Sequence, residues 1–441
     1  MPDYIYIKKK IKSFKKKISV SSDKSISIRS ILLASQAVGT SKISNLLESE
    51  DVINALKTIK KLGINYTKDN NTYRIEGFGL NGFNLKKKTT INAGNSGTLA
   101  RLILGMLVKS KFKVKLIGDK SLSKRDFSRV INPLKLFGAN IKSKNNLLPI
   151  EILGSDFLRP INYHENIGSA QVKSCLILAG LNTPGKTIIR SKISRNHTEL
   201  MLNFLKYPIK IKRKKKFDKI EVEGLNQFRS FKYNVPGDIS SAAFFIVLTL
   251  LSKKSNILIE NVNVNPSRAG IINILNNMGA NIKLRNTKIY NGEKISNISV
   301  RSNQKLKSVN CSPVHNTSAI DEFLIIFLVA AKAKGVSKFK NLGEMNKKES
   351  KRLDIAVKFL KLIGIKVKRF NDDISIYGNP SLELSSSFEI KNFLKDHRIF
   401  FLSTIAALTL GGKWKIHDKD SINTSFPSFL DKLKSIGAKI N

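Results

Sequence analysis

The chain contains few of the residues that build metal centres or disulfide frameworks. Cys175 and Cys311 are its two cysteines among 441 residues, which excludes a disulfide-stapled scaffold. Its five histidines are scattered without the spacing of a metal-binding motif. We therefore expect no metal ion and a reducing, cytoplasmic location.

Long apolar segments are also missing. The longest runs, 242–251 and 323–331, fall short of the roughly 18 residues that a membrane-spanning helix requires. The basic stretch 1–17 lacks the apolar core of a signal peptide. We expect neither a membrane span nor a membrane partner.

Acidic residues are scarce, at 32 against 78 lysines and arginines, which gives a formal net charge of +46. Such a charge is typical of proteins that bind nucleic acid, but those cluster basic residues with exposed aromatic side chains. Here the excess is mostly lysine, is spread over the chain and accompanies much Ile and Asn, as a bias toward AT-rich codons would produce. We expect no specific nucleic-acid partner, although part of the charge could serve anionic substrates.

One local pattern dominates what is present. In the stretch 22–35 a polar loop turns directly into an apolar helix. Asp23 or Ser25 can cap that helix, because either side chain can accept from free N–H groups of the first turn. Lys24 and Arg29 stand at the same end, where the helix dipole also attracts anions. The pattern predicts an anion-binding helix start.

The pattern occurs six times, at intervals of about 70 to 80 residues. The further copies begin the segments 95–104, 169–179, 238–245, 321–326 and 396–401. A second, amphipathic helix repeats in step and ends at glycine, in 56–63, 130–138, 271–279, 357–364 and 429–437. In the third copy Leu202–Lys206 leads instead to Tyr207 and Pro208. The repetition predicts six α/β units in two globular domains of three units, with the midpoint near 235–237.

Charged side chains accompany these helix starts. The cations are Lys24, Arg29, Arg101, Arg125, Lys173, Lys348, Arg352 and Arg398. The acids are Asp321, Glu322, Glu349 and Asp396. A single member would be read as a surface charge, but the whole set indicates a site for a polyanionic substrate, with carboxylates that move protons.

Ten stretches carry a resemblance to a known family. They are 23–29, 94–101, 118–125, 169–174, 194–199, 235–242, 320–322, 348–352, 396–398 and 424–427. In this order, and in phase with the repeats, they resemble the 5-enolpyruvylshikimate-3-phosphate synthase (3-phosphoshikimate 1-carboxyvinyltransferase) family over essentially the full length.

The resemblance implies an α/β fold of two similar domains, each an inside-out α/β barrel. Each domain has three βαβαββ-type units with buried helices and outer sheets, which makes six repeats. It places repeats 1–3 in residues 21–236 and repeats 4–6 in residues 1–20 plus 237–441, with the active site in the cleft between the domains. The quaternary state expected is a monomer.

The resemblance also implies a reaction of the shikimate pathway to chorismate and aromatic amino acids. The enolpyruvyl group of phosphoenolpyruvate is transferred to the 5-hydroxyl of shikimate 3-phosphate, and phosphate is released. The route is addition and then elimination through a tetrahedral intermediate, without metal or organic cofactor.

Site residues follow by matching motif. For shikimate 3-phosphate they are Lys24, Ser25, Arg29, Ser169, Ala170, Gln171, Ser194, Asp321 and Lys348. For phosphoenolpyruvate they are Lys24, Gly97, Arg125, Gln171, Arg352 and Arg398. Asp321 is the implied base at the 5-hydroxyl, Glu349 the implied proton donor and acceptor at C3, and Lys24 the catalytic cation that reaches both substrates.

The chain departs from the family pattern at several positions. Asp126 follows Arg125 where proline is usual, and an acid there could weaken the hold of Arg125 on phosphoenolpyruvate. Asn346 and Lys351 stand where Arg and Asp are frequent. Some members use a lysine near 424–425, and this chain has none there.

The alternative enzyme is the related UDP-N-acetylglucosamine enolpyruvyl transferase. That enzyme shares the fold but uses a cysteine in a loop. Neither Cys175 nor Cys311 lies in such a motif, so the sequence favours the shikimate reaction.

Overall fold

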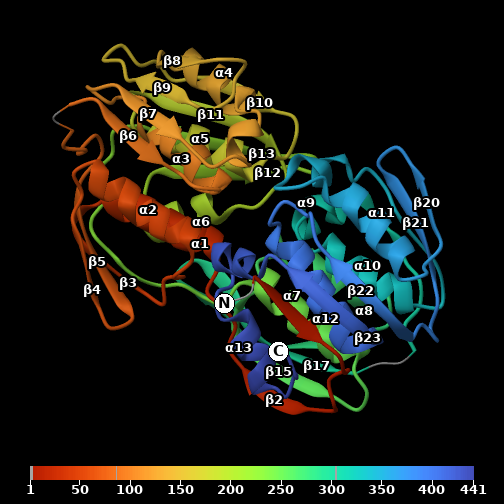
Figure 1. Cartoon of the computed structure of the whole chain (residues 1–441). Helices are drawn as coiled ribbons and strands as arrows, with labels where there is room; N and C mark the ends of the chain where they lie inside the picture. Colours follow the sequence, from red (N-terminus) through yellow and green to blue (C-terminus); the bar gives the residue numbers. More distant parts are fainter. Residues whose placement is uncertain (1–2, 86, 303–304) are drawn as a thin grey trace. The chain divides into compact units, whose positions relative to one another are not determined.

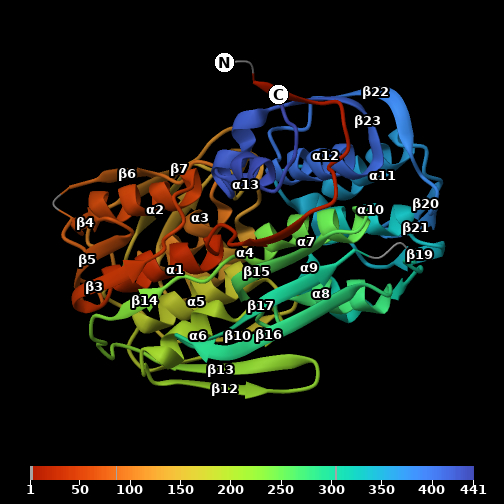
Figure 2. The same ribbon diagram turned by 90° about the horizontal axis from the view of Figure 1, so that it is seen from below.

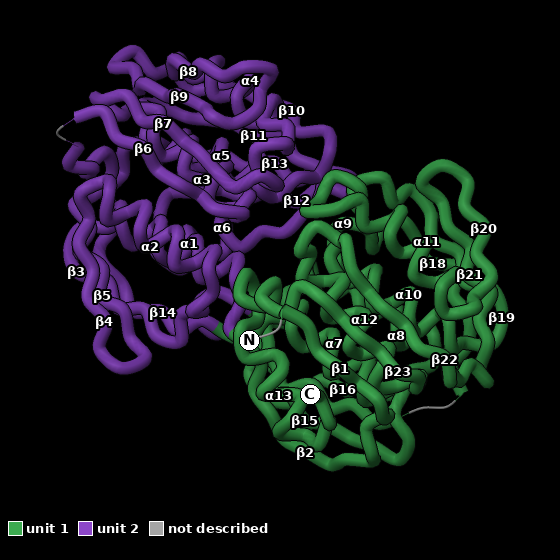
Figure 3. The backbone as a smooth tube through the Cα atoms, in the orientation of Figure 1, with its two compact units in different colours: residues 1–21, 236–288, 294–441 green, residues 22–235, 289–293 purple. Residues whose placement is uncertain are grey.

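A computed structural model describes residues 3–85, 87–302 and 305–441, which fall into two compact units (Figure 3). Unit 1 comprises Met1–Ser21, Pro236–Lys288 and Lys294–Asn441. Unit 2 comprises Ser22–Val235 and Ile289–Glu293. The latter segment is the tip of a hairpin whose strands otherwise belong to unit 1. Each unit has its own hydrophobic core.

Unit 2 alternates helices and strands along the chain (Figure 1). Its helices are α1 (Lys24–Ser35), α2 (Glu50–Lys61), α3 (Gly97–Met106), η1 (Leu122–Lys124), α4 (Ser128–Leu136), α5 (Ala170–Leu181) and α6 (His197–Phe204). Its strands are β3 (Val38–Ser44), β4 (Tyr66–Asp69), β5 (Thr72–Phe78), β6 (Thr89–Asn92), β7 (Val114–Ile117), β8 (Asn140–Ser143), β9 (Ile150–Leu153), β10 (Asn162–Glu165), β11 (Lys186–Lys192), β12 (Ile209–Arg213), β13 (Phe217–Glu223) and β14 (Lys232–Asn234).

Unit 1 takes its first two strands from the start of the chain and the rest from its second half. Its helices are α7 (Ile239–Leu251), α8 (Gly270–Asn277), η2 (Pro313–His315), α9 (Asn316–Ala319), α10 (Phe323–Lys332), η3 (Gly343–Lys347), α11 (Arg352–Leu362), α12 (His397–Leu410), η4 (Lys419–Thr424) and α13 (Phe429–Ser435). Its strands are β1 (Tyr4–Ile7), β2 (Lys15–Ile18), β15 (Asn256–Asn263), β16 (Asn281–Tyr290), β17 (Glu293–Arg301), β18 (Asn310–Cys311), β19 (Gly335–Phe339), β20 (Val367–Phe370), β21 (Asp373–Gly378), β22 (Leu384–Ile390) and β23 (Gly411–His417).

The strands form six small mixed sheets, which confirms the α/β class. In unit 2 the strand orders are β14-β3-β5-β4, β6-β7-β9-β8 and β10-β11-β13-β12. In unit 1 they are β16-β17-β15-β2, β18-β19-β21-β20 and β1-β23-β22. In each sheet of unit 2 the first pair is parallel and the next two pairs are antiparallel.

The apolar helices predicted from the six-fold pattern are α1, α3, α5, α7, α10 and α12. Nearly every residue of these helices is buried, as expected for helices that are apolar on all faces. In unit 1, α7, α10 and α12 contact one another, and in unit 2, α3 packs against α1 and α5 (Figure 2). Helices α1, α5, α7, α10 and α12 also contact strands of a sheet, as α1 does with β5 and α12 with β23.

Capping side chains begin five of these helices, as predicted. The five are Asp23, Ser96, Ser169, Asp238 and Asp396, and each accepts from a backbone N–H of the first turn. At α1 the cap is Asp23, whose Oδ1 lies 2.9 Å from the Ile26 nitrogen, while Ser25 lies inside the helix. Helix α10 differs, because its N-cap Glu322 makes no cap bond and its carboxylate instead accepts from Ser240.

The amphipathic helices end as the glycine pattern predicts. The glycines after α2, α4, α8, α11 and α13 all have positive φ, and they are Gly63, Gly138, Gly279, Gly364 and Gly437. The third copy, α6, uses Lys206 at φ 57° instead. Among the described residues, we find no helix with both the length and the apolar content needed to cross a membrane.

Candidate active site

The candidate residues of unit 2 begin at the start of α1. Lys24 is the first helical residue, and its Nζ lies 2.9 Å from Oδ2 of Asp51 in the first turn of α2. The Lys24 side chain is 22% exposed, so its ammonium remains within reach of a ligand. Ser25 follows on the same turn, and its carbonyl oxygen accepts a hydrogen bond from Nη1 of Arg29.

Arg29 lies one turn further into α1 and is buried. Its Nε donates to Oγ1 of Thr198 at 2.9 Å, its Nη1 to the Ser25 carbonyl at 2.9 Å, and its Nη2 to Oγ of Ser174 at 3.1 Å. Burial lowers the pKa of Arg29 to about 10, and the attraction of Glu199 and Asp23 does not offset it. A buried cation with incomplete compensation favours an anionic ligand.

Gly97, the first residue of α3, leaves room for two arginines. A Cβ on Gly97 would lie 2.8 Å from Nη1 of Arg101 and 3.0 Å from Nη1 of Arg125. Arg125 donates to Oδ1 of Asn95 at 2.5 Å, and Asn95 is held by Asp119 at 2.8 Å. Two guanidinium groups therefore approach one backbone position at a helix start, which suits a small anion such as a carboxylate or phosphate.

The start of α5 adds polar groups. Ser169 caps the helix, Ala170 opens it, and Gln171 connects it to α3. The Gln171 oxygen accepts from Nη1 of Arg101 at 3.1 Å, and its nitrogen donates to Oγ1 of Thr98 at 3.1 Å. Arg101 was recognised in the sequence as a cation near a helix start but was not assigned to a substrate.

Two further unit 2 residues show what the sequence could not resolve. Lys173 is fully buried, and its Nζ lies 2.8 Å from Oε1 of Glu199. It therefore forms an internal ion pair, which the cation pattern did not anticipate. The hydroxyl of Ser194 is buried without a hydrogen-bond partner among the described residues, so a ligand hydroxyl or phosphate oxygen could satisfy it.

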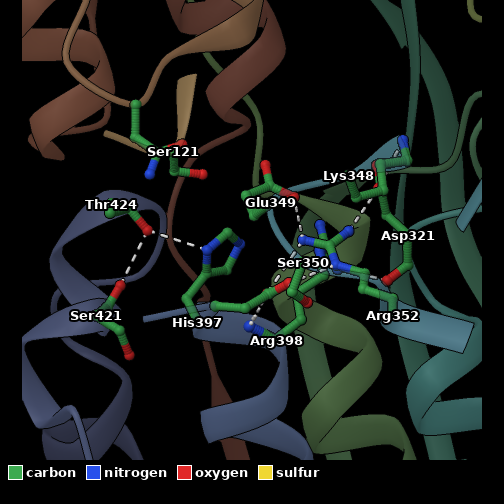
Figure 4. Close-up of polar contacts among 12 residues, drawn as sticks. Ser121, Asp321, Lys348, Glu349, Ser350, Arg352, His397, Arg398, Ser421 and Thr424 are labelled. Atoms are coloured by element: carbon green, nitrogen blue, oxygen red, sulfur yellow. Dashed lines mark hydrogen bonds and ion pairs between the residues drawn. The ribbon is translucent and has the colours of Figure 1, made fainter. Parts of the chain in front are cut away.

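The candidate residues of unit 1 gather around Arg352, the first residue of α11 (Figure 4). Its Nε lies 2.9 Å from Oδ2 of Asp396, its Nη2 2.5 Å from Oε2 of Glu349, and its Nη1 3.2 Å from Oδ1 of Asp321. The Arg352 side chain is 2% exposed. One buried guanidinium thus holds three carboxylates together.

This network shifts the titration of its members. Burial by itself would lower the pKa of Arg352, but Asp396 and then Glu349 raise that pKa above its usual value. Burial likewise disfavours ionised Asp396, and Arg352 outweighs burial, so the pKa of Asp396 lies below its usual range. Both shifts stabilise the charged forms.

Asp321, in the turn before α10, has other cationic neighbours. Nζ of Lys348 lies 3.3 Å from its Oδ1, and Nη1 of Arg268 lies 3.9 Å from its Oδ2. Arg268 also lies 2.8 Å from the α7 cap Asp238. Arg268 is not among the site residues predicted from the sequence, although its place two residues before the start of α8 was a usable signal.

Arg398 occupies the first turn of α12. Its Nη1 donates to the backbone carbonyl of Asp321 at 2.8 Å and lies 3.7 Å from Oε1 of the buried Glu322. The preceding residue, His397, lies 3.1 Å from Oγ1 of Thr424, at the end of η4 (Figure 4). Helix α12 therefore places an arginine next to the carboxylate network.

The positions that depart from the family pattern have local roles. The Asp126 carboxylate accepts from the backbone N–H of Ser128 at 2.8 Å and so supports the start of α4. Asn346 accepts from the backbone of Leu353 at 2.9 Å in the first turn of α11. Lys351 is the exposed N-cap residue of that helix.

The arrangement supports anion binding and proton transfer. Unit 2 supplies cations with hydroxyl and amide neighbours, and unit 1 supplies carboxylates that share an arginine. Within the ranges that the structure describes, no group of three or more His, Cys, Asp or Glu side chains could hold a metal ion.

Comparisons with known proteins agree on one family. Residues 8–433 match the family model described as EPSP synthase (3-phosphoshikimate 1-carboxyvinyltransferase). The 3-phosphoshikimate 1-carboxyvinyltransferase of Vesicomyosocius okutanii is 42% identical over 425 residues, 96% of each chain. The protein of the same name from Alkaliphilus oremlandii is 36% identical over 437 residues, 98% of this chain and 99% of that one.

Solved structures give the same result. EPSP synthase from Acinetobacter baumannii superimposes with a TM-score of 0.87 at 34% identity and covers 99% of both chains. The enolpyruvyl transferase NikO from Streptomyces tendae has a TM-score of 0.76 at 14% identity, covering 99% of this chain and 98% of that one, and shows the fold alone.

Proposed function

The chain belongs to the EPSP synthase (3-phosphoshikimate 1-carboxyvinyltransferase) family, and from this premise we propose how it acts. It transfers the enolpyruvyl group of phosphoenolpyruvate to the 5-hydroxyl of shikimate 3-phosphate and releases phosphate, in the pathway to chorismate and aromatic amino acids. The observation that carries the mechanism is the Arg352 guanidinium, which holds Asp321 and Glu349 together.

Substrate binding uses both sets of residues. Shikimate 3-phosphate binds Lys24, Ser25, Arg29, Ser169, Ala170, Gln171 and Ser194, with Asp321 and Lys348. Phosphoenolpyruvate binds Lys24, Gly97, Arg125, Gln171, Arg352 and Arg398. Two observations support these assignments. Arg29 is a buried cation near the start of α1. Arg101 and Arg125 bring positive charge close to Gly97 at the start of α3, where an anion is favoured. Both units therefore contribute residues to substrate binding.

The reaction proceeds in two steps. In the addition, Asp321 takes the proton of the 5-hydroxyl, the oxygen attacks C2 of phosphoenolpyruvate, and Glu349 gives a proton to C3. In the elimination, Glu349 removes a proton from C3, the bond from C2 to the phosphate oxygen breaks, and phosphate leaves. Lys24, which reaches both substrates, and the arginines stabilise the charge of the tetrahedral intermediate.

The alternative, a UDP-N-acetylglucosamine enolpyruvyl transferase, needs a reactive cysteine. Cys175 is buried in α5, and burial raises its pKa to about 12. Cys311 is buried in β18, and burial raises its pKa to about 11. Both thiols therefore stay protonated at neutral pH, so neither is a candidate nucleophile.

We also propose how the helices and strands are arranged within each unit. Each unit consists of three βαβαββ-type repeats, arranged as an inside-out barrel with its helices inside. The recurrence of one parallel and two antiparallel strand pairs in the unit 2 sheets supports this arrangement, as do the five capped apolar helices. The enzyme acts as a cytoplasmic monomer on small molecules, without nucleic acid.

The test replaces each carboxylate in the full chain and measures phosphate release with both substrates. Asp321→Asn and Glu349→Gln should each lower kcat by about 10²–10⁴-fold with little change in KM. Glu344→Gln is the matched control, because Glu344 lies nearby in η3 and pairs with the exposed Lys347. A rise in KM without loss of kcat would refute the proton-transfer roles, and wild-type protein inactive with both substrates would refute the function.

A further inference from the structure

One sheet of unit 2 carries a row of cations on its outer face. Lys232 on β14 pairs with Lys42 on β3, and Lys42 pairs with Arg74 on β5. The neighbours along these strands, such as Ile43 and Tyr233, are buried. Because side chains alternate between the faces of a strand, the three cations share the face opposite the core.

Like charges directly opposite each other in a sheet are destabilising. The equivalent position in the next sheet differs, because Lys115 on β7 pairs with Thr90 on one side and with Glu151 on the other. Lys42 has a cation on both sides instead. The row of Lys232, Lys42 and Arg74 is therefore electrostatically unfavourable, and the β6-β7-β9-β8 sheet has no such row at the equivalent position.

The row lines a cavity with a volume of about 440 Å³. The next row across the same strands adds polar groups to its wall, from Asn234, Ser44 and Thr72. The hairpin tip also lines the cavity, through Tyr290 and Asn291. All of these residues belong to unit 2.

We propose that this cavity binds a small phosphate dianion, either free or as the phosphate group of a small metabolite. Three cations and the single carboxylate of Asp69 line it, so the wall carries a net charge of about +2. Asp69 lies 3.7 Å from Nη2 of Arg74 and compensates only that end of the row. The Ser44 and Thr72 hydroxyls, 2.9 Å apart, supply hydrogen bonds to phosphate oxygens.

The short extent of the positive charge favours a small ligand over a nucleic acid. The row on the other side of Lys42 and Arg74 holds Thr40 and Glu76, which are neutral and acidic. Positive charge therefore ends within the cavity and does not continue as a track that a polyanion could follow. The proposal is independent of the proposed enzymatic function, because it uses none of the assigned substrate residues.

The first test measures binding of inorganic phosphate to the full chain by calorimetry at constant ionic strength. The double variant Lys42→Gln/Arg74→Gln should weaken binding about tenfold or more, while Lys115→Gln should not change it. Arg125→Gln, which weakens anion binding at the candidate active site, should leave this binding event in place. The proposal would be overturned if Arg125→Gln lost phosphate binding while the double variant kept it. It would also be overturned if the protein bound RNA tightly but did not bind phosphate.

The second test uses thermal unfolding. Without phosphate, Lys42→Gln should raise Tm by relieving the repulsion between the opposed cations, whereas Lys115→Gln should not raise it, because no cation lies opposite Lys115. Phosphate should raise the Tm of wild type and of Lys115→Gln by more than that of Lys42→Gln. Equal responses of all three proteins would overturn the proposal.

Discussion

Two buried arginines, one in each unit, are held in opposite ways. Arg29 in unit 2 donates to two hydroxyls and a carbonyl, and burial lowers its pKa to about 10. Arg352 in unit 1 is surrounded by three carboxylates, and its pKa is raised although it is equally buried. The first cation still lacks much of its counter-charge, and the second is fully compensated. The environment of Arg29 therefore suits binding of an anion, whereas the environment of Arg352 holds acidic side chains in place.

The largest expected effect comes from removing the compensated arginine. Arg352→Gln leaves Asp321, Glu349 and Asp396 without their shared cation, so the free energy of unfolding of unit 1 should fall by about 3–5 kcal/mol. Trp414 is the only tryptophan of the chain and lies buried in unit 1, so its fluorescence in a denaturant titration reports this unit. The double variant Arg352→Gln/Asp396→Asn should recover part of the loss. An unchanged midpoint for Arg352→Gln would show that the network contributes nothing to folding.

Removing the uncompensated arginine should instead affect binding. Arg29→Gln should weaken binding of shikimate 3-phosphate by roughly 10- to 100-fold, the value of one or two charge-assisted hydrogen bonds. Stability should change by only about 1 kcal/mol, because Thr198 still donates to Ser174 at 2.7 Å. Calorimetry measures the first and unfolding the second, with Arg29→Lys as the charge-conserving control. A large loss of stability with intact binding would reverse the contrast between the two arginines.

A smaller effect is expected at the start of α3. In Gly97→Ala the new methyl group comes closest to the ends of Arg101 and Arg125, which can move. The KM for phosphoenolpyruvate should rise roughly tenfold with little loss of stability. Gly105→Ala, in the same helix, is the contrasting control, because its Cβ would lie 2.1 Å from the Cys175 carbonyl oxygen and should destabilise unit 2. An unaltered KM in Gly97→Ala would remove Gly97 from the binding assignment.

The smallest effect concerns acid stability. The folded-state pKa of Asp396 lies below its usual value of 3.8 because Arg352 favours the carboxylate. Its stabilising contribution is therefore complete above pH 3.8 and disappears as the pH falls below 3.8 through the folded-state pKa. Asp396→Asn should be less stable than wild type at neutral pH, and the difference should shrink in acid. Trp414 fluorescence in urea at several pH values measures it, and a pH-independent difference would contradict the assignment.

Local patterns predicted the helix starts because a cap lies within a few residues of the N–H that it satisfies. Asp23, Ser169 and Asp396 were all found in this way. The glycines that end the amphipathic helices were predicted for the same reason, since the left-handed conformation is a property of one residue.

Partners from distant elements could not be predicted. Lys173 and Arg29 looked alike in the sequence, yet Lys173 is neutralised by Glu199 from α6 and Arg29 is not fully compensated. Arg268 gained its role only through Asp238 and Asp321, which lie on other elements. Burial and the pairing of charges depend on packing that no local window contains.

The pairing of β1 with β23 has a consequence for biosynthesis. Tyr4 lies opposite His417 and Ile7 opposite Trp414, so β1 and β23 adjoin in one sheet of unit 1 (Figure 3). On the ribosome this sheet cannot form until the C-terminal strand has emerged. The segment Ser22–Val235, by contrast, contains all of unit 2 except the hairpin tip and is available for folding when half of the chain has been translated. The strand β1 therefore has no partner strand until residues 411–417 have been translated.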